Sequence, residues 1–137
     1  MPRESAREID LDPRKTVGLE LPIKSNNISD FAVTHNSLQQ SQHNLKNLLL
    51  THIGERVGQP DFGSRLRALC FEQDDTELPE KIEVEVRRAV SEWLPYINIL
   101  STSILTEEGN ANKIHVTITY STTLNSESLQ SVTIDAT

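Results

Sequence analysis

The chain has 137 residues, of which 36% are hydrophobic and 24% charged, and its formal net charge is -7. This balance predicts one modest globular domain. Acidic charge without a run of Lys or Arg excludes a concentrated positive surface, so we expect no nucleic-acid partner. The chain shows no signal-peptide pattern and no long apolar stretch, so we expect no membrane contact. Its single cysteine, Cys70, excludes an internal disulfide and is expected to be buried.

The first part of the chain is predicted to contain an arm, an extended segment and a helix. Residues 1–16 mix acids and bases with little apolar content, which predicts a flexible arm before a single domain, residues 17–137. Residues 17–23 contain Gly and Pro among apolar residues, which is typical of an edge strand. Thr34 is the expected N-cap of a helix from about His35 to about Thr51. Its apolar stripe consists of Leu38, Leu45, Leu48 and Leu49.

A loop and a short helix are predicted next. Residues 54–63 hold three glycines and Pro60, too many helix and strand breakers for regular structure. In this loop, Arg56 could bind a carboxylate or cap helix carbonyls, and Asp61 could cap the next helix. The short helix has apolar residues at helical spacing, and Phe71 is expected to close it against the core. These residues are Leu66, Leu69 and Cys70.

The clearest periodicity in the chain predicts a second long helix. Pro79 suits the first turn of a helix, and Pro95 disfavours helical geometry at Leu94, where we expect the helix to end. Between them, one apolar stripe recurs at the spacing of an α-helix. It consists of Ile82, Val86, Ala89, Val90 and Trp93.

From Ile97 onward the period changes to two, which predicts strands. We expect Ile97, Ile99 and Leu105 on one face of the first strand, with Leu100 and Ile104 on the other. A hairpin loop over residues 107–112 should follow, and then a half-buried strand. In that strand Ile114, Val116, Ile118 and Tyr120 alternate with His115, Thr117 and Thr119. Residues 129–134 could form a short third strand.

The predicted fold class is therefore α+β. Two longer helices and a short helix should pack on a small antiparallel sheet with a C-terminal β-hairpin. A small sheet leaves exposed edges, which are an aggregation hazard unless a partner strand occupies them.

The acids and histidines do not indicate catalysis. Glu55 and Asp61 could be proposed as the carboxylate pair of a glycoside hydrolase, but some such pair is always available among 20 acidic residues. The four histidines share no metal-binding spacing, and no phosphate-binding glycine loop is present. We therefore expect no catalytic, cofactor-binding or metal-binding residue, and no cofactor.

One ordered set of motifs resembles a known family. Residues 51–56 (THIGER) are followed by residues 60–63 (PDFG), and then by Leu66, Leu69, Phe71 and Glu72. Residues 18–23 (GLELPI) and 89–97 extend the likeness on both sides. Over roughly residues 17–120, the chain resembles the baseplate wedge family of contractile phage tails, which is related to type VI secretion baseplate subunits.

The resemblance implies a structural protein of the virion's tail baseplate, assembled in the host cytoplasm. It implies docking onto larger wedge proteins and nucleation of the tail sheath by accepting sheath strands, with tail tube or hub proteins as further candidate partners. Two alternatives stay open: a baseplate subunit of a phage-derived injection particle or type VI-like secretion system, and a cell-wall hydrolase.

The resemblance also implies two sets of contact residues. Family members commonly carry Glu-Pro-Arg where this chain has Leu94-Pro95-Tyr96, so an apolar docking contact is expected there. The full expected partner-binding set is Gly54, Glu55, Arg56, Pro60, Asp61, Phe62, Gly63, Trp93, Leu94, Pro95 and Tyr96. Strand addition by the sheath is expected at the edge formed by Ile114, Val116, Thr117, Ile118, Thr119 and Tyr120.

Overall fold

The structure is a computed structural model that describes residues 12, 14–21, 23, 32–72, 76–107 and 110–136. The chain forms two compact units, Met1–Asn44 and Leu45–Thr137. The predicted arm lies mostly outside the described residues, and the division into an arm and one domain stays a prediction.

The first unit contains a short antiparallel pair and the start of a helix. Strand β1 (Gly18–Leu19) pairs with β2 (Val33–Thr34), and α2 (Ser37–Leu50) follows. The predicted N-cap is wrong: Thr34 is a buried residue of β2, and its hydroxyl donates to Oε1 of Gln40. Asn36 caps the helix instead, because its Oδ1 accepts the backbone N–H of Gln39 at 2.7 Å.

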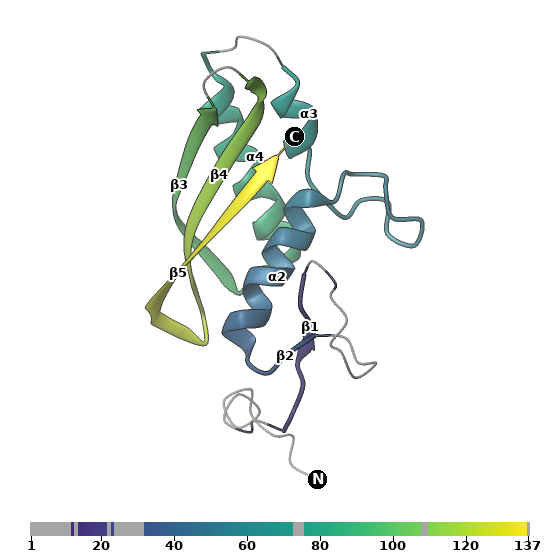
Figure 1. The fold of residues 1–137 in the computed structure, drawn as a ribbon, viewed down its shortest axis with the longest axis vertical. Coiled ribbons are helices and arrows are strands. Elements are labelled where there is room, and N and C mark those ends of the chain that lie inside the picture. Colours follow the sequence, from purple (N-terminus) through teal and green to yellow (C-terminus); the bar gives the residue numbers. More distant parts are fainter. Residues whose placement is uncertain are drawn as a thin grey trace. The chain divides into compact units, whose positions relative to one another are not determined.

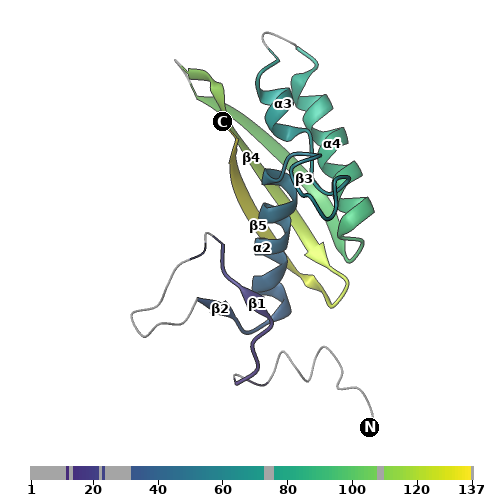
Figure 2. The same cartoon turned by 90° about the vertical axis from the view of Figure 1, so that its right-hand side faces the viewer.

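The second unit is an α+β arrangement, as predicted. It holds α3 (Leu66–Cys70), α4 (Leu78–Trp93), β3 (Ile97–Glu107), β4 (Asn110–Thr122) and β5 (Asn125–Ala136). The three strands form one antiparallel sheet in which β4 lies between β3 and β5 (Figure 1). The helices α3 and α4 lie side by side (Figure 2), with α4 against β3 and α3 against β4 and β5.

The core forms between these helices and one face of the sheet. The predicted stripe of α4 is buried from Ile82 to Val90, and Trp93 is half-buried at the margin. The helix has Pro79 in its first turn and ends at Trp93, with Leu94 as its C-cap, as predicted. The inward residues of β4 are almost fully buried, which stabilises the fold by roughly 1.5–3 kcal/mol for each large aliphatic side chain. They are Ile114, Val116, Ile118 and Tyr120.

A β-bulge makes the predicted faces of β3 wrong at Ile104 and Leu105, whereas Leu100 is exposed, opposite to Ile97 and Ile99, as predicted. The pairing with β4 shifts between Ile99 and Ser101, so two residues oppose one. Side chains after the bulge therefore change faces. Ile104 packs against the core, whereas Leu105 is exposed.

Two other local predictions are wrong. The predicted hairpin loop 107–112 is shorter, because β3 continues to Glu107 and β4 begins at Asn110. Phe71 does not close α3 against the core: it is the C-cap residue and its side chain is 60% exposed. The preceding residue, Cys70, is buried as predicted, and burial raises the pKa of its thiol.

Candidate functional site

The loop that carries the family-like motif is tied closely at its base. The backbone N–H of Ser64 donates to the carbonyl of Thr51 at 2.9 Å, and the Ser64 hydroxyl donates to the carbonyl of Leu49 at 2.7 Å. Gly63 has φ +125°, and a Cβ at this position would collide with the Thr51 carbonyl. Gly63 is therefore required by the backbone of the loop base.

An aromatic stack joins this loop to the end of α4. The guanidinium carbon of Arg56 lies 4.1 Å from the ring centroid of Phe62. The Phe62 ring in turn meets Trp93 edge to face, with 5.2 Å between centroids and 69° between planes. Such contacts each contribute about 0.5–1.5 kcal/mol beyond area burial. In this structure, Arg56, Phe62 and Trp93 hold the loop on the helix.

The outer part of the loop is exposed. Gly54, Glu55, Arg56, Pro60 and Asp61 are all exposed residues. Val57 at the tip is fully exposed as well. The suggested capping role of Asp61 is wrong, because α3 begins after Arg65 and has no side-chain cap. Of the predicted partner-binding loop residues, Gly63 is thus buried and Phe62 half-buried, and the other five are exposed.

A hollow of about 650 Å³ lies between the loop and α3. Its lining combines apolar surface from Ile53, Ala68 and Phe71 with one acid and one base, Glu55 and Arg67. Glu55 is held in place because its Oε2 accepts the backbone N–H of His52 at 2.9 Å. Sequence analysis missed this hollow, since it treated Phe71 as a core residue.

The second predicted contact region is the turn between α4 and β3. Leu94 is buried and belongs to the core, so its predicted role in an apolar docking patch is wrong. Pro95 is exposed and Tyr96 half-buried. The Tyr96 carbonyl accepts the backbone N–H of Thr123 at 3.0 Å, which joins this turn to the β4–β5 turn. There Leu124 is exposed, and it adds an apolar side chain that the sequence pattern did not single out.

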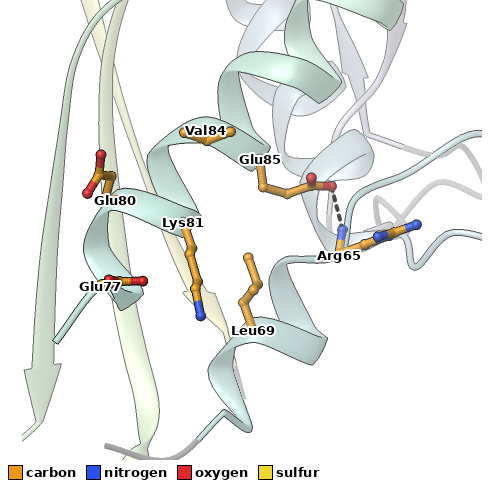
Figure 3. Close-up of a pocket in the computed structure, with 7 residues that line it drawn as sticks. All are labelled: Arg65, Leu69, Glu77, Glu80, Lys81, Val84 and Glu85. Atoms are coloured by element: carbon orange, nitrogen blue, oxygen red, sulfur yellow. Dashed lines mark hydrogen bonds between the residues drawn. The ribbon is translucent and has the colours of Figure 1, made fainter. Parts of the chain in front are cut away.

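A groove of about 480 Å³ separates α3 from α4 (Figure 3). Leu69 of α3 and Lys81 of α4 point toward one another across it. Glu85 closes one side: its carboxylate accepts the Arg65 backbone N–H at 2.8 Å and pairs with Arg88 at 2.8 Å. Burial favours the neutral form of Glu85, but the bonds from Arg88 and Arg65 outweigh it and lower its pKa. This carboxylate is therefore held ionised.

The strand predicted to form the open sheet edge is central. From Ile114 to Tyr120, β4 pairs with β3 on one side and β5 on the other. Its backbone hydrogen-bonding groups are therefore occupied, and the predicted edge of Ile114, Val116, Thr117, Ile118, Thr119 and Tyr120 is wrong. The outer strands of the sheet are β3 and β5.

The described part of the chain shows neither a metal-binding cluster nor a membrane-spanning helix. There, no group of three or more His, Cys, Asp or Glu side chains is placed to hold a metal ion. No described helix is long and apolar enough to cross a bilayer.

The family of the chain follows from sequence comparison. The family model of baseplate wedge protein gp25 matches residues 36–127, which include the loop, both long helices and most of the sheet. The chain belongs to this baseplate wedge family. It is thus a baseplate component of contractile tails or tail-like particles, as its motifs predicted. A comparison with curated protein sequences found no significant match.

Three solved structures have a fold similar to that of this chain. A protein from Geobacter sulfurreducens, described as a candidate tail lysozyme, is 26% identical with a TM-score of 0.62, covering 77% of this chain and 97% of its own. A chain of the anti-feeding prophage baseplate is 14% identical, with a TM-score of 0.58 over 86% and 82% of the two chains. A chain of the postcontracted pyocin R2 baseplate is 18% identical, with a TM-score of 0.56 over 73% and 97%.

The family match and the site geometry overlap only in part. The match includes the loop, the α4–β3 turn and the β4–β5 turn. It ends at residue 127, near the start of β5. Most of the outer strand β5 therefore lies beyond the segment that identifies this wedge protein.

Proposed function

We propose that this wedge protein is a structural subunit that docks onto larger wedge proteins and starts sheath assembly by accepting strands of the sheath protein. The observation that supports this most is the sheet itself. Within the described residues, β3 and β5 each pair with a strand on one side only. An added strand would gain main-chain hydrogen bonds there, and the alternation of side chains would set its register.

Two accessible surfaces support docking onto other baseplate proteins. The loop presents Val57 together with exposed polar residues, and its base is fixed by Gly63 and Ser64. The joined turns present Pro95 and Leu124. Rigid, partly apolar surfaces lose little conformational entropy on binding. The same proposal applies to a phage tail assembled in the host cytoplasm and to a phage-derived particle.

The carboxylates favour a structural role over hydrolysis of cell walls. Glycoside hydrolysis needs an acid whose pKa is raised so that it can donate a proton. Glu85, the acid best enclosed by the groove, has a lowered pKa instead. Glu55 and Asp61 are both exposed on the loop. We expect purified protein to leave peptidoglycan intact. Turnover that disappears in Glu55→Gln or Glu85→Gln would contradict this.

Hydrogen–deuterium exchange on particles tests strand acceptance directly. Amides on the open side of β3 or β5 should exchange slowly in particles with a sheath and at least tenfold faster in sheathless baseplates. Peptides from β4 provide the internal control, because its amides are already paired. Equal exchange of both outer strands in the two kinds of particle would show that the sheath does not add a strand to this sheet.

A further inference from the structure

We infer that the two outer strands are not equivalent: a partner strand adds to β5, and the outer edge of β3 is closed. This inference rests on the proposed function, because it concerns which edge of the same sheet is used. Three features of the second unit support it.

The first feature is the irregularity of β3. The bulge between Ile99 and Ser101 breaks the regular spacing of backbone groups that an added strand needs. The carbonyl of Ile99 is also occupied, since it accepts a hydrogen bond from Nη1 of Arg87 at 3.4 Å. Arg87 is itself held by an ion pair with Glu83 at 3.0 Å. A strand arriving at β3 would have to match a bulge and compete with this side chain.

The second feature is the regularity of β5. Its pairing with β4 runs without a shift from Gln130 to Ala136. Natural sheet edges are commonly protected by Pro, Lys or a bulge. Neither β3 nor β5 contains Pro, Lys or Arg, but the pairing of β5 shifts only between Asn125 and Gln130, next to the β4–β5 turn. In the described chain, no other strand pairs with its outer side. From Gln130 to Ala136 the edge is therefore regular, and Asp135 is its one charged residue.

The third feature is the hollow beside the loop. Its helical lining comes from α3 (Arg67, Ala68) and Phe71, with no residue of α4, so it lies on the side of α3 away from α4. Because α3 contacts β4 and β5 whereas α4 contacts β3, the side of α3 away from α4 faces the β5 side of the sheet, although loop and helix residues alone line the hollow. Val132 and Ile134 are the buried, inward-facing residues of β5. An added strand with apolar residues at alternate positions would extend the inward, apolar face of the sheet beyond β5, in the direction of Phe71.

The partner is thus an extended segment of the sheath protein with alternating apolar residues. Its main chain pairs with β5, and an apolar side chain on its inward face enters the hollow. Charged Glu55 and Arg67 at the hollow favour a segment that places polar groups around that side chain.

A matched pair of photo-crosslinking positions tests the choice of edge. Ser101 of β3 and Ser131 of β5 are both exposed and both lie opposite Thr119, one on each side of β4. A photoreactive phenylalanine analogue would replace each serine in assembled particles. We expect the Ser131 variant to crosslink to the sheath protein at least tenfold more than the Ser101 variant.

The outcomes separate this inference from the proposed function. Crosslinking mainly from position 101 would overturn the choice of β5 and leave strand acceptance intact. No crosslink to the sheath from either position, with both variants present in sheathed particles, would count against strand acceptance itself and so against both proposals.

A second matched pair tests the hollow. Phe71 and Val84 are exposed to the same extent, 60% and 63%, but Phe71 lines the hollow and Val84 lines the groove between α3 and α4. Phe71→Ala should weaken binding of purified sheath protein about tenfold or more, as expected for the loss of a buried apolar contact. Val84→Ala should leave binding unchanged. Equal affinities for the two variants would remove the hollow from the interface.

Discussion

The two faces of the β3–β4–β5 sheet have opposite roles. The inward side chains of β4, from Ile114 to Tyr120, are aliphatic or aromatic and almost completely buried. On the outward face, Thr117 and His115 of β4 pair with polar side chains of β5. Thr117 bonds Thr133 at 3.2 Å, and His115 contacts Asp135 at 2.5 Å.

Because of this difference, the inward face should provide most of the stability and the outward face only a small part. The inward face removes apolar area from water, which is the dominant favourable term in folding. The outward pairs each contribute only about 0.2–1 kcal/mol. Substitutions should therefore become less harmful in the order core, loop base, helix junction and outward face.

The largest effect should come from the centre of the inward face. Ile118→Ala should lower the free energy of unfolding by about 2–5 kcal/mol, because it removes buried methyl groups and leaves a cavity. Its neighbour Thr119 points outward, so Thr119→Ala should cost less than about 0.5 kcal/mol. Chemical denaturation of the two variants measures both. Similar losses would mean that the two faces are not energetically distinct.

The loop base should follow. Gly63→Ala should cost roughly 2–3 kcal/mol, because the new Cβ meets the Thr51 carbonyl and the positive φ becomes strained. Gly54 provides the control: it also has a positive φ, +92°, but no atom lies within 4 Å of an added Cβ. Gly54→Ala should therefore cost only about 1 kcal/mol of backbone strain. Thermal unfolding should rank the two variants in this order.

The junction between α3 and α4 should contribute less and depend on pH. Glu85→Gln should cost about 1 kcal/mol at neutral pH by removing the charge that Arg88 binds. The folded-state pKa of Glu85 lies below its ordinary value of 4.5. Its contribution is thus complete above that value and is lost as the pH falls through the lower, folded-state pKa. Denaturation at pH 7 and below pH 4 should show the variant approaching the parent in acid. A constant difference would contradict this assignment.

The smallest effect should come from the outward face. Asp135→Asn keeps the size of the side chain and removes its charge opposite His115, so it should cost less than about 0.5 kcal/mol. A loss comparable to that of Ile118→Ala would show that the outward face contributes as much to stability as the buried inward face.

The sequence predicted helices better than strand faces, for a physical reason. In α4, Pro79 and Pro95 mark both ends and five apolar residues recur at the helical period, so local signals agree. In β3, one extra residue at the bulge turns the side chains that follow it to the other face of the sheet. No residue type in that stretch predicts a bulge. The partner strand β4 decides this register, and sequence periodicity contains no information about pairing.

The candidate site was predicted in part. The sequence predicts the loop as a unit, but it places Leu94 at the surface because the family motif has charged residues on both sides of its proline. Phe71 is exposed because α3 ends at Cys70, one residue before it. A helix of five residues has too few turns for its sequence pattern to define where it ends. The central position of β4 was missed because β5 is rich in Ser and Thr and was expected to be much shorter than its twelve residues.

The buried cysteine gives the protein a native reporter of local opening. Cys70 closes α3, and its thiol is the only one in the chain. A thiol reagent can reach it only when α3 separates from the sheet, so the labelling rate measures how often that segment opens. Slower labelling in an assembled baseplate than in the isolated subunit would report, without any introduced probe, that assembly rigidifies the helix next to β5.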